Sequence, residues 1–161
     1  MKKGLYFILL IAVVAVGYLI WDTNKPVQDE PENEHTIENV QFSDDILVEE
    51  VTFDSEKQSL RYVMKNNTGK TLEYGAVFTI MKLSDDNALI ETDLTDDLAF
   101  DMALRTVEAG DTFSDEVLFN LFTEPIDSGT YYIIREYRDS EGNEHIPRVH
   151  FIKNGEIQPG K

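Results

Sequence analysis

Seven carboxylates in one short stretch of the chain are the first residues that could do chemistry. No Lys or Arg lies among them, and they are Asp85, Asp86, Glu91, Asp93, Asp96, Asp97 and Asp101. Carboxylate oxygens in loops are the ligands that calcium prefers, but the Gly and Glu positions of an EF-hand loop are missing here. The spacing also gives no sign of the separated pair of acids that glycoside cleavage requires. The stretch therefore predicts a solvated acidic loop, and a calcium site is the alternative.

The histidines indicate neither a metal site nor a catalytic one. His145 and His150 are five residues apart in one extended run, so their side chains point to opposite faces unless Pro147 introduces a bulge. His35 lies in a separate region of the chain. The motifs of P-loop proteins, zinc proteases and serine hydrolases are missing from the sequence. We therefore expect no catalytic residues, no metal, no cofactor and no enzymatic activity.

The composition excludes further classes of protein. The 161 residues include no Cys, so the chain has no disulfide, no thiolate nucleophile and no lipid-modified N-terminal Cys. The net charge is −17. Because binding to phosphates requires a basic stripe, nucleic acid is not an expected partner.

The N-terminal residues predict a membrane segment. Residues 4–21 form a run of 18 uncharged residues. As a helix this run would extend ~27 Å and nearly cross the ~30 Å hydrocarbon layer. Two lysines precede the run and an aspartate follows it, which keeps the N-terminus in the cytoplasm and places the rest outside. A signal peptide would end in small residues, whereas the bulky Trp21 ends this run, so residues 1–21 favour an uncleaved single-pass anchor over a cleaved, secreted form.

Residues 22–45 predict a disordered acidic linker. They contain eight acids, one Lys and two Pro, with few apolar residues. Such a segment cannot bury enough apolar surface to offset the entropy that it would lose on folding, and its like charges extend it. Its expected role is to hold a domain away from the bilayer.

Residues 46–155 show the short alternating runs that are typical of β-strands. Strands are expected at 46–53, 59–65, 71–83, 88–94, 99–107, 112–120, 130–138 and 144–152. The run 71–83 should present one buried face made of Leu72, Tyr74, Ala76, Phe78 and Ile80. The run 99–107 should alternate through Phe100, Met102 and Leu104. Because proline cannot donate to a β-ladder, Pro147 predicts a sheet edge or a bulge in the last run.

About seven short strands without a helical stripe indicate an all-β, two-sheet sandwich. The stretch DSGTY at 127–131 narrows this prediction, because it resembles the D-x-G-x-Y corner of immunoglobulin-like sandwiches. In that corner the Tyr131 hydroxyl is expected to bond to main chain a few residues upstream. Gly129 would allow the sharp turn, and the Asp127 side chain would bond amides of the loop. The fold is thus expected to be an immunoglobulin-like β-sandwich, preceded by a transmembrane helix and the acidic linker.

Three longer stretches resemble a family of bacterial Ig-like domains that is common in Gram-positive cell-envelope proteins. They are NNTGKTLEYGAVFTI (66–80), VEAGDTFSDEVLF (107–119) and SGTYYIIREY (128–137), and the likeness covers most of residues 46–152. The chain departs from the family pattern at Ala109, which is often Pro, and at Tyr132, which is often Arg. The resemblance implies an Ig-like fold and carries over no catalytic residue.

Four apolar residues are expected to point away from the core on two neighbouring strands: Val77, Met81, Tyr132 and Ile134. Exposed apolar patches often mark partner surfaces, so these four are the predicted interaction patch. The expected function is that of a membrane-anchored, extracytoplasmic Ig-like binding module, without catalysis, whose partner is another envelope or extracellular protein. A cleaved secreted factor or inhibitor is one alternative, and a calcium-dependent adhesin using Asp85–Asp101 is the other.

Overall fold

The structure, a computed structural model, describes residues 40–160. The predicted anchor at 4–21 and linker residues 22–39 lie outside this range. No helix within it is long and apolar enough to cross a membrane. Its elements are β1 (Ile46–Asp54), β2 (Ser59–Asn66), β3 (Leu72–Tyr74), β4 (Thr79–Leu83), β5 (Leu89–Glu91), η1 (Asp93–Thr95), β6 (Arg105–Val107), β7 (Thr112–Leu118), η2 (Phe119–Leu121), β8 (Gly129–Ile134), β9 (Tyr137–Asp139), β10 (Glu144–His145), β11 (Val149–Asn154) and β12 (Glu156–Pro159). Because η1 and η2 are single 3-10 turns, the prediction of an all-β domain is confirmed.

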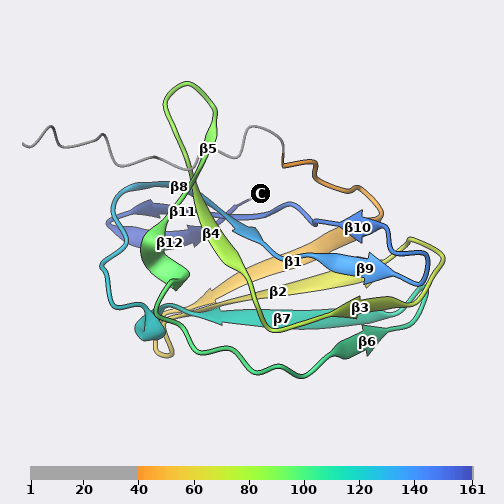
Figure 1. Cartoon of the computed structure of the whole chain (residues 1–161). Helices are drawn as coiled ribbons and strands as arrows, with labels where there is room; N and C mark the ends of the chain where they lie inside the picture. Colours follow the sequence, from red (N-terminus) through yellow and green to blue (C-terminus); the bar gives the residue numbers. More distant parts are fainter. Residues whose placement is uncertain (1–39, 161) are drawn as a thin grey trace, which may run out of the picture. The chain divides into compact units, whose positions relative to one another are not determined.

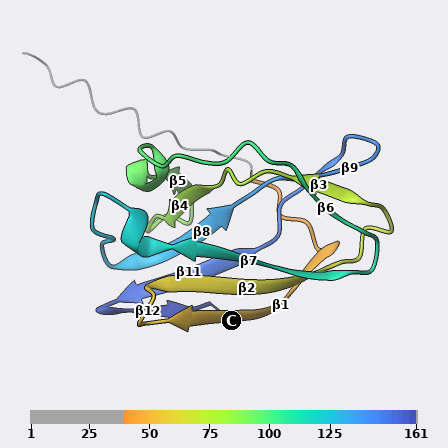
Figure 2. The same ribbon diagram turned by 90° about the horizontal axis from the view of Figure 1, so that it is seen from below.

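The strands form two layers around one core (Figures 1 and 2). One layer is the three-stranded sheet β1-β2-β7. The other contains two sheets, with strand orders β10-β9-β3-β6 and β12-β11-β8-β4-β5. Every strand pair is antiparallel. This is an Ig-like sandwich in which the second layer is interrupted.

The interruption divides three long strands at the same level. The breaks fall at residues 75–78, 135–136 and 146–148, which separate β3 from β4, β9 from β8 and β10 from β11. Each break contains a residue poorly suited to a strand: Gly75 has no side chain to pack, Arg135 is charged, and Pro147 has no N–H for the ladder. The prediction of one continuous strand over 71–83 is therefore wrong.

The break keeps the alternation of buried residues in phase. Between the pairs Glu73–Arg138 and Thr79–Ile134, one strand advances six residues while its partner advances four. Because side chains alternate with a period of two, an excess of two residues leaves the inward face unchanged. Four of the five residues predicted for this face accordingly stay buried on both sides of the break, namely Leu72, Tyr74, Phe78 and Ile80, whereas Ala76 inside the break is half-buried.

Three further expectations about strands need correction. The predicted strand 99–107 is reduced to β6, and Met102 and Leu104 are 91% and 73% exposed because residues 99–104 join no sheet. Pro147 lies between two strands, and β11 after it is an inner strand between β8 and β12. The sandwich also continues past residue 155, where β12 adds to β11. Residues 40–160 contain twelve short strands in place of the eight expected ranges, because three of those ranges are interrupted and β12 is added.

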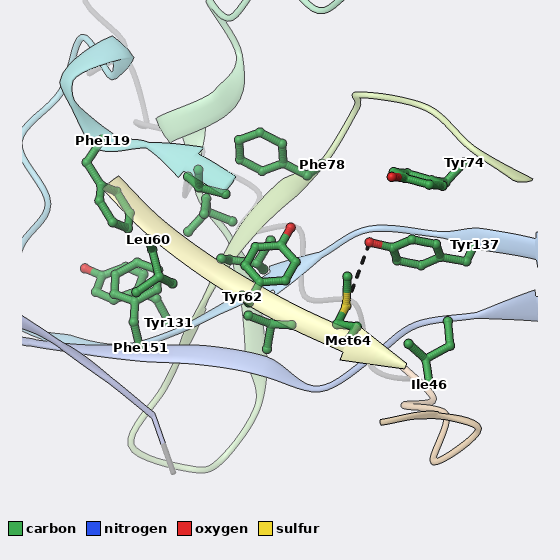
Figure 3. Close-up of a cluster of buried hydrophobic side chains, with 14 of the residues drawn as sticks. Ile46, Leu60, Tyr62, Met64, Tyr74, Phe78, Phe119, Tyr131, Tyr137 and Phe151 are labelled. Atoms are coloured by element: carbon green, nitrogen blue, oxygen red, sulfur yellow. Dashed lines mark hydrogen bonds between the residues drawn. The ribbon is translucent and has the colours of Figure 1, made fainter. Parts of the chain in front are cut away.

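Aromatic side chains from both layers meet in the core (Figure 3). Tyr62 and Met64 of β2 point toward the second layer, where the Tyr137 hydroxyl donates to the Met64 sulfur at 4.0 Å. Tyr131 stacks on Phe151 with 5.2 Å between ring centroids. Burial raises the pKa of Tyr62 to about 12, so its phenol stays neutral at physiological pH. Burying one large apolar side chain stabilises a fold by ~1.5–3 kcal/mol, and this core needs no disulfide.

Candidate functional site

Tyr131 holds the corner where the chain enters β8. Its hydroxyl donates to the main-chain oxygen of Asp127 at 3.1 Å, four residues upstream. Gly129 has φ +158°, and a Cβ at this position would lie 2.8 Å from Cε of Lys82. The Asp127 side chain is exposed and makes no hydrogen bond to any residue between 40 and 160, contrary to expectation. The corner therefore depends on a phenol and a glycine, and its role is structural.

The four residues of the predicted patch do not form one exposed surface. Met81 is 0% exposed, so its assignment to a surface patch is wrong. β4 lies between β8 and β5, and η1 packs against it after the chain turns back. The turn is fixed by Thr92, whose N–H and hydroxyl both donate to the Ile80 carbonyl oxygen, at 3.1 and 2.7 Å. This return covers a face of β4 that was expected to be open.

Tyr132, which pairs with Met81, is half-buried beneath the start of the described chain. Its ring lies 5.4 Å from that of Phe42, and it stacks on His150 at 5.4 Å. The N–H of Ser43 donates to the Ile146 carbonyl oxygen at 2.8 Å. Residues 40–45, expected to be the end of the linker, thus pack on the sandwich.

The other two patch residues, Val77 and Ile134, line a hollow at the break in the second layer. The hollow measures about 460 Å³, and Leu104 contributes a third apolar side chain from the segment before β6. Val77 is 58% exposed and Leu104 is 73% exposed. The polar part of the lining carries Glu73, Glu136 and Arg138, and the Arg138 guanidinium pairs with Glu136 at 3.4 Å. An apolar centre within a charged rim is typical of protein interfaces.

A buried ion pair lies under the same break. The Arg135 side chain is 4% exposed and forms an ion pair with Asp115 of β7, which joins the two layers. Its Nη2 donates to the Ala76 carbonyl oxygen at 3.1 Å. Its guanidinium also lies over the Phe78 ring, 5.3 Å from the centroid, and Phe78 lines the hollow. Arg135 therefore ties the loop at Ala76 to β7 of the opposite layer.

Leu104 and Arg135 are site residues that the sequence pattern did not predict. Arg135 had a visible signal, since it occupies an inward position between Ile133 and Tyr137 in a strictly alternating run. A charged residue in that phase indicates a buried pair. Leu104 had no such signal, because its exposure depends on residues 99–104 leaving the sheet.

The acidic stretch does not assemble into a metal site. No group of three metal-ligating side chains occurs among residues 40–160. The acids are spread along the chain: Asp86 accepts from Ser84 in the turn between β4 and β5, whereas Asp101 pairs with Arg105 at 3.0 Å. The two histidines also stay apart, with His150 beside Tyr132 and His145 Nε2 3.5 Å from Asp139.

Asp139 organises the hairpin from β9 to β10. The 2%-exposed carboxylate accepts from Asn143 Nδ2 at 2.8 Å and from Lys70 Nζ at 3.1 Å. It also accepts from the N–H groups of Glu141 and Asn143, each at 2.9 Å. These donors, the Asn143 side chain foremost, hold the pKa of Asp139 well below its ordinary value. Donors within the chain occupy the Asp139 carboxylate, so the cluster stabilises the hairpin and leaves no open position for a ligand.

The comparison with protein families agrees with this architecture. Among curated proteins nothing matches the chain. The model of the bacterial Ig-like domain matches residues 33–147, which is more than half of the chain. This range includes the Tyr131 corner and the break, and it starts before Phe42, in keeping with the packing of residues 40–45. The chain belongs to the bacterial Ig-like domain family.

Proposed function

We propose that the chain is a membrane-anchored, extracytoplasmic interaction module without catalytic activity. Its partner, another envelope or extracellular protein, binds at the hollow lined by Val77, Leu104 and Ile134. The observation that carries this proposal is the exposure of two large apolar side chains, Val77 and Leu104, at the mouth of that hollow. Family membership supports a binding role, and a charged rim around an apolar centre supports a protein partner.

The buried pair beneath the hollow supports the same role. Arg135 bonds to the carbonyl of Ala76 and to Asp115 on the opposite layer, so the loop that carries Val77 is held in place before any partner arrives. A site that is already ordered loses less conformational entropy on binding. The anchoring part of the proposal rests on the uncharged run at 4–21, with the acidic linker as a spacer.

Site-specific photo-crosslinking on intact cells tests the hollow. A photoreactive amino acid is introduced at Leu104 in the full chain, expressed in its own host. We expect a discrete crosslinked band, and we expect Val77→Ser to reduce its yield severalfold because it removes the apolar centre. Leu47→photoreactive residue is the matched control, since Leu47 is also exposed, at 49%, and lies on β1 away from the hollow.

Equal crosslinking from positions 104 and 47, or a yield that Val77→Ser leaves unchanged, would contradict the hollow as the binding site. Thermal unfolding of the Val77→Ser chain checks that the fold persists. Substitutions at exposed positions usually change stability by less than ~0.5 kcal/mol, so the melting temperature should stay nearly constant.

A further inference from the structure

The outer edge of β7 pairs with no strand among the described residues. β7 pairs with β2 alone, and its main chain makes one further hydrogen bond there, from the Glu116 N–H to the Asp115 carboxylate at 2.8 Å. In Ig-like sandwiches of the constant type a fourth strand, D, lies on this edge. Here the residues in that position join no sheet until β6, which pairs with β3 of the other layer. In Figure 1 the chain between η1 and β6 passes β7 without joining it.

A groove lies in the place of the missing strand. It measures about 550 Å³, within the ~300–1,000 Å³ range of ligand pockets. Leu98 and Phe100 line it from the unpaired segment, and Leu118 and Leu121 line it from the end of β7 and from η2. Leu118 is 37% exposed and Leu121 is 56% exposed, so apolar surface is available at one end.

The groove is acidic even after its internal ion pairs are counted. Four carboxylates line it, and two of them are paired: Asp101 with Arg105 at 3.0 Å, and Asp115 with Arg135. Asp97 and Glu116 have no basic partner among residues 40–160. The net charge of the whole chain is −17. An occupant with basic side chains is therefore favoured over an acidic one.

We propose that this groove binds an extended basic peptide segment of a partner protein, which adds to β7 as the missing fourth strand. Hydrogen bonds along β7 provide affinity, alternate apolar side chains of the peptide enter the groove, and its Lys or Arg residues face Asp97 and Glu116. A second copy of β7 would place the like charges of Asp115 and Glu116 opposite each other, which disfavours self-pairing. This site shares only Phe78 with the hollow, so the inference does not rest on the proposed function.

The test uses a fluorescein-labelled seven-residue peptide of alternating Lys and Val, with the full-length chain in a nonionic detergent. Fluorescence anisotropy should show saturable binding, and a Glu-Val peptide of equal length should not bind. Glu116→Lys should weaken binding roughly 10-fold, because a basic peptide then meets a like charge. Glu124→Lys is the matched control: it changes the net charge equally, at an exposed position that does not line the groove, and should have little effect.

Hydrogen exchange of the same complex locates the peptide. We expect slower exchange of main-chain amides within 112–118, and unchanged exchange in the edge strands β5 and β12. Absence of binding at millimolar peptide, equal weakening by Glu124→Lys, or protection at another edge would overturn the proposal. Protection of 112–118 in the chain alone, together with a dimeric mass, would also overturn it by showing that a second copy occupies the edge. None of these outcomes depends on crosslinking at the hollow, so the two proposals can fail separately.

Discussion

Single side chains fix the turns that connect the strands of this sandwich. Asn66, at the end of β2, is completely buried, and its Nδ2 donates to the carbonyl oxygens of Lys70, Val107 and Glu108 at 2.8, 3.2 and 3.1 Å. Tyr131 does the same for the corner before β8 through one hydroxyl bond. Such bonds use polar groups inside the fold, where leaving a partner unsatisfied costs ~1–3 kcal/mol.

Tyr131→Phe should destabilise the fold by about 1 kcal/mol, because it removes one hydrogen bond and leaves the Asp127 carbonyl without it. Urea unfolding of the full chain measures the change. Tyr132→Phe is the control, since the Tyr132 hydroxyl bonds to nothing among residues 40–160, and it should be close to neutral. Equal losses for the two variants would mean that the corner bond has no special role.

Asn66→Ala should be more damaging than Asn67→Ala. The first removes bonds to three carbonyl oxygens at a fully buried position, so we expect a loss of at least ~2 kcal/mol. Asn67 is exposed, and only its main-chain N–H is used, in a bond to Asp45. Melting curves of both variants check this, and a larger loss at Asn67 would contradict the account of the turn.

The carboxylate of Asp139 should make stability fall in acid. Its folded pKa lies below the ordinary value of 3.8, chiefly because the Asn143 side chain donates to the charged form. A carboxylate whose pKa is lower in the folded than in the unfolded state stabilises the fold at pH values above the unfolded-state pKa. This stabilisation is lost as the pH falls from the unfolded-state pKa to the folded-state pKa. Asp139→Asn should therefore flatten the decline of melting temperature below about pH 4. Asp85→Asn, at an exposed position, is the control. If the melting temperature of Asp139→Asn declined in acid as steeply as that of the unmodified chain, the Asp139 carboxylate would not be the source of the acid sensitivity.

At the scale of the elements, the break in the second layer decides where the proposed binding hollow lies. The alternation in 71–83 and 130–138 predicted which residues are buried, and the structure confirms this for Leu72, Tyr74, Phe78 and Ile80 but not for Ala76. It could not reveal the break, because a two-residue excess leaves the same pattern as an uninterrupted strand. The burial of Met81 could not be predicted from the sequence either, because it depends on the chain turning back at Thr92 so that η1 packs on β4.

β12 is an element that the sequence pattern did not predict, and its contribution is measurable. Ile157 is 9% exposed and belongs to the core, whereas Ile152 on neighbouring β11 is 39% exposed. Ile157→Ala should lower the free energy of unfolding by ~2–4 kcal/mol. Ile152→Ala should cost much less, because little surface is buried there. Chemical denaturation measures the free energy of unfolding of both variants. Equal losses in the two variants would contradict the inclusion of residues beyond 155 in the folded core.

At the scale of the molecule, one side of the sandwich carries both proposed sites. The segment from Asp97 to Arg105 lines both: residues 97–101 and Arg105 line the groove, and Leu104 lines the hollow. A net charge of −17 favours a basic partner surface over an acidic one. The charge could be read from the sequence, but the concentration of sites on one side could not, because it follows from how 97–105 leaves the sheet.

Methionine oxidation tests the binding role of this side most directly. Met102, which is 91% exposed in the segment that lines both sites, should oxidise rapidly in the purified full chain, while the fully buried Met64 and Met81 should resist. On intact cells that express the chain at its natural level, we predict that Met102 becomes protected, because a bound partner covers it. Equal oxidation of Met102 on cells and in the purified chain would contradict the account.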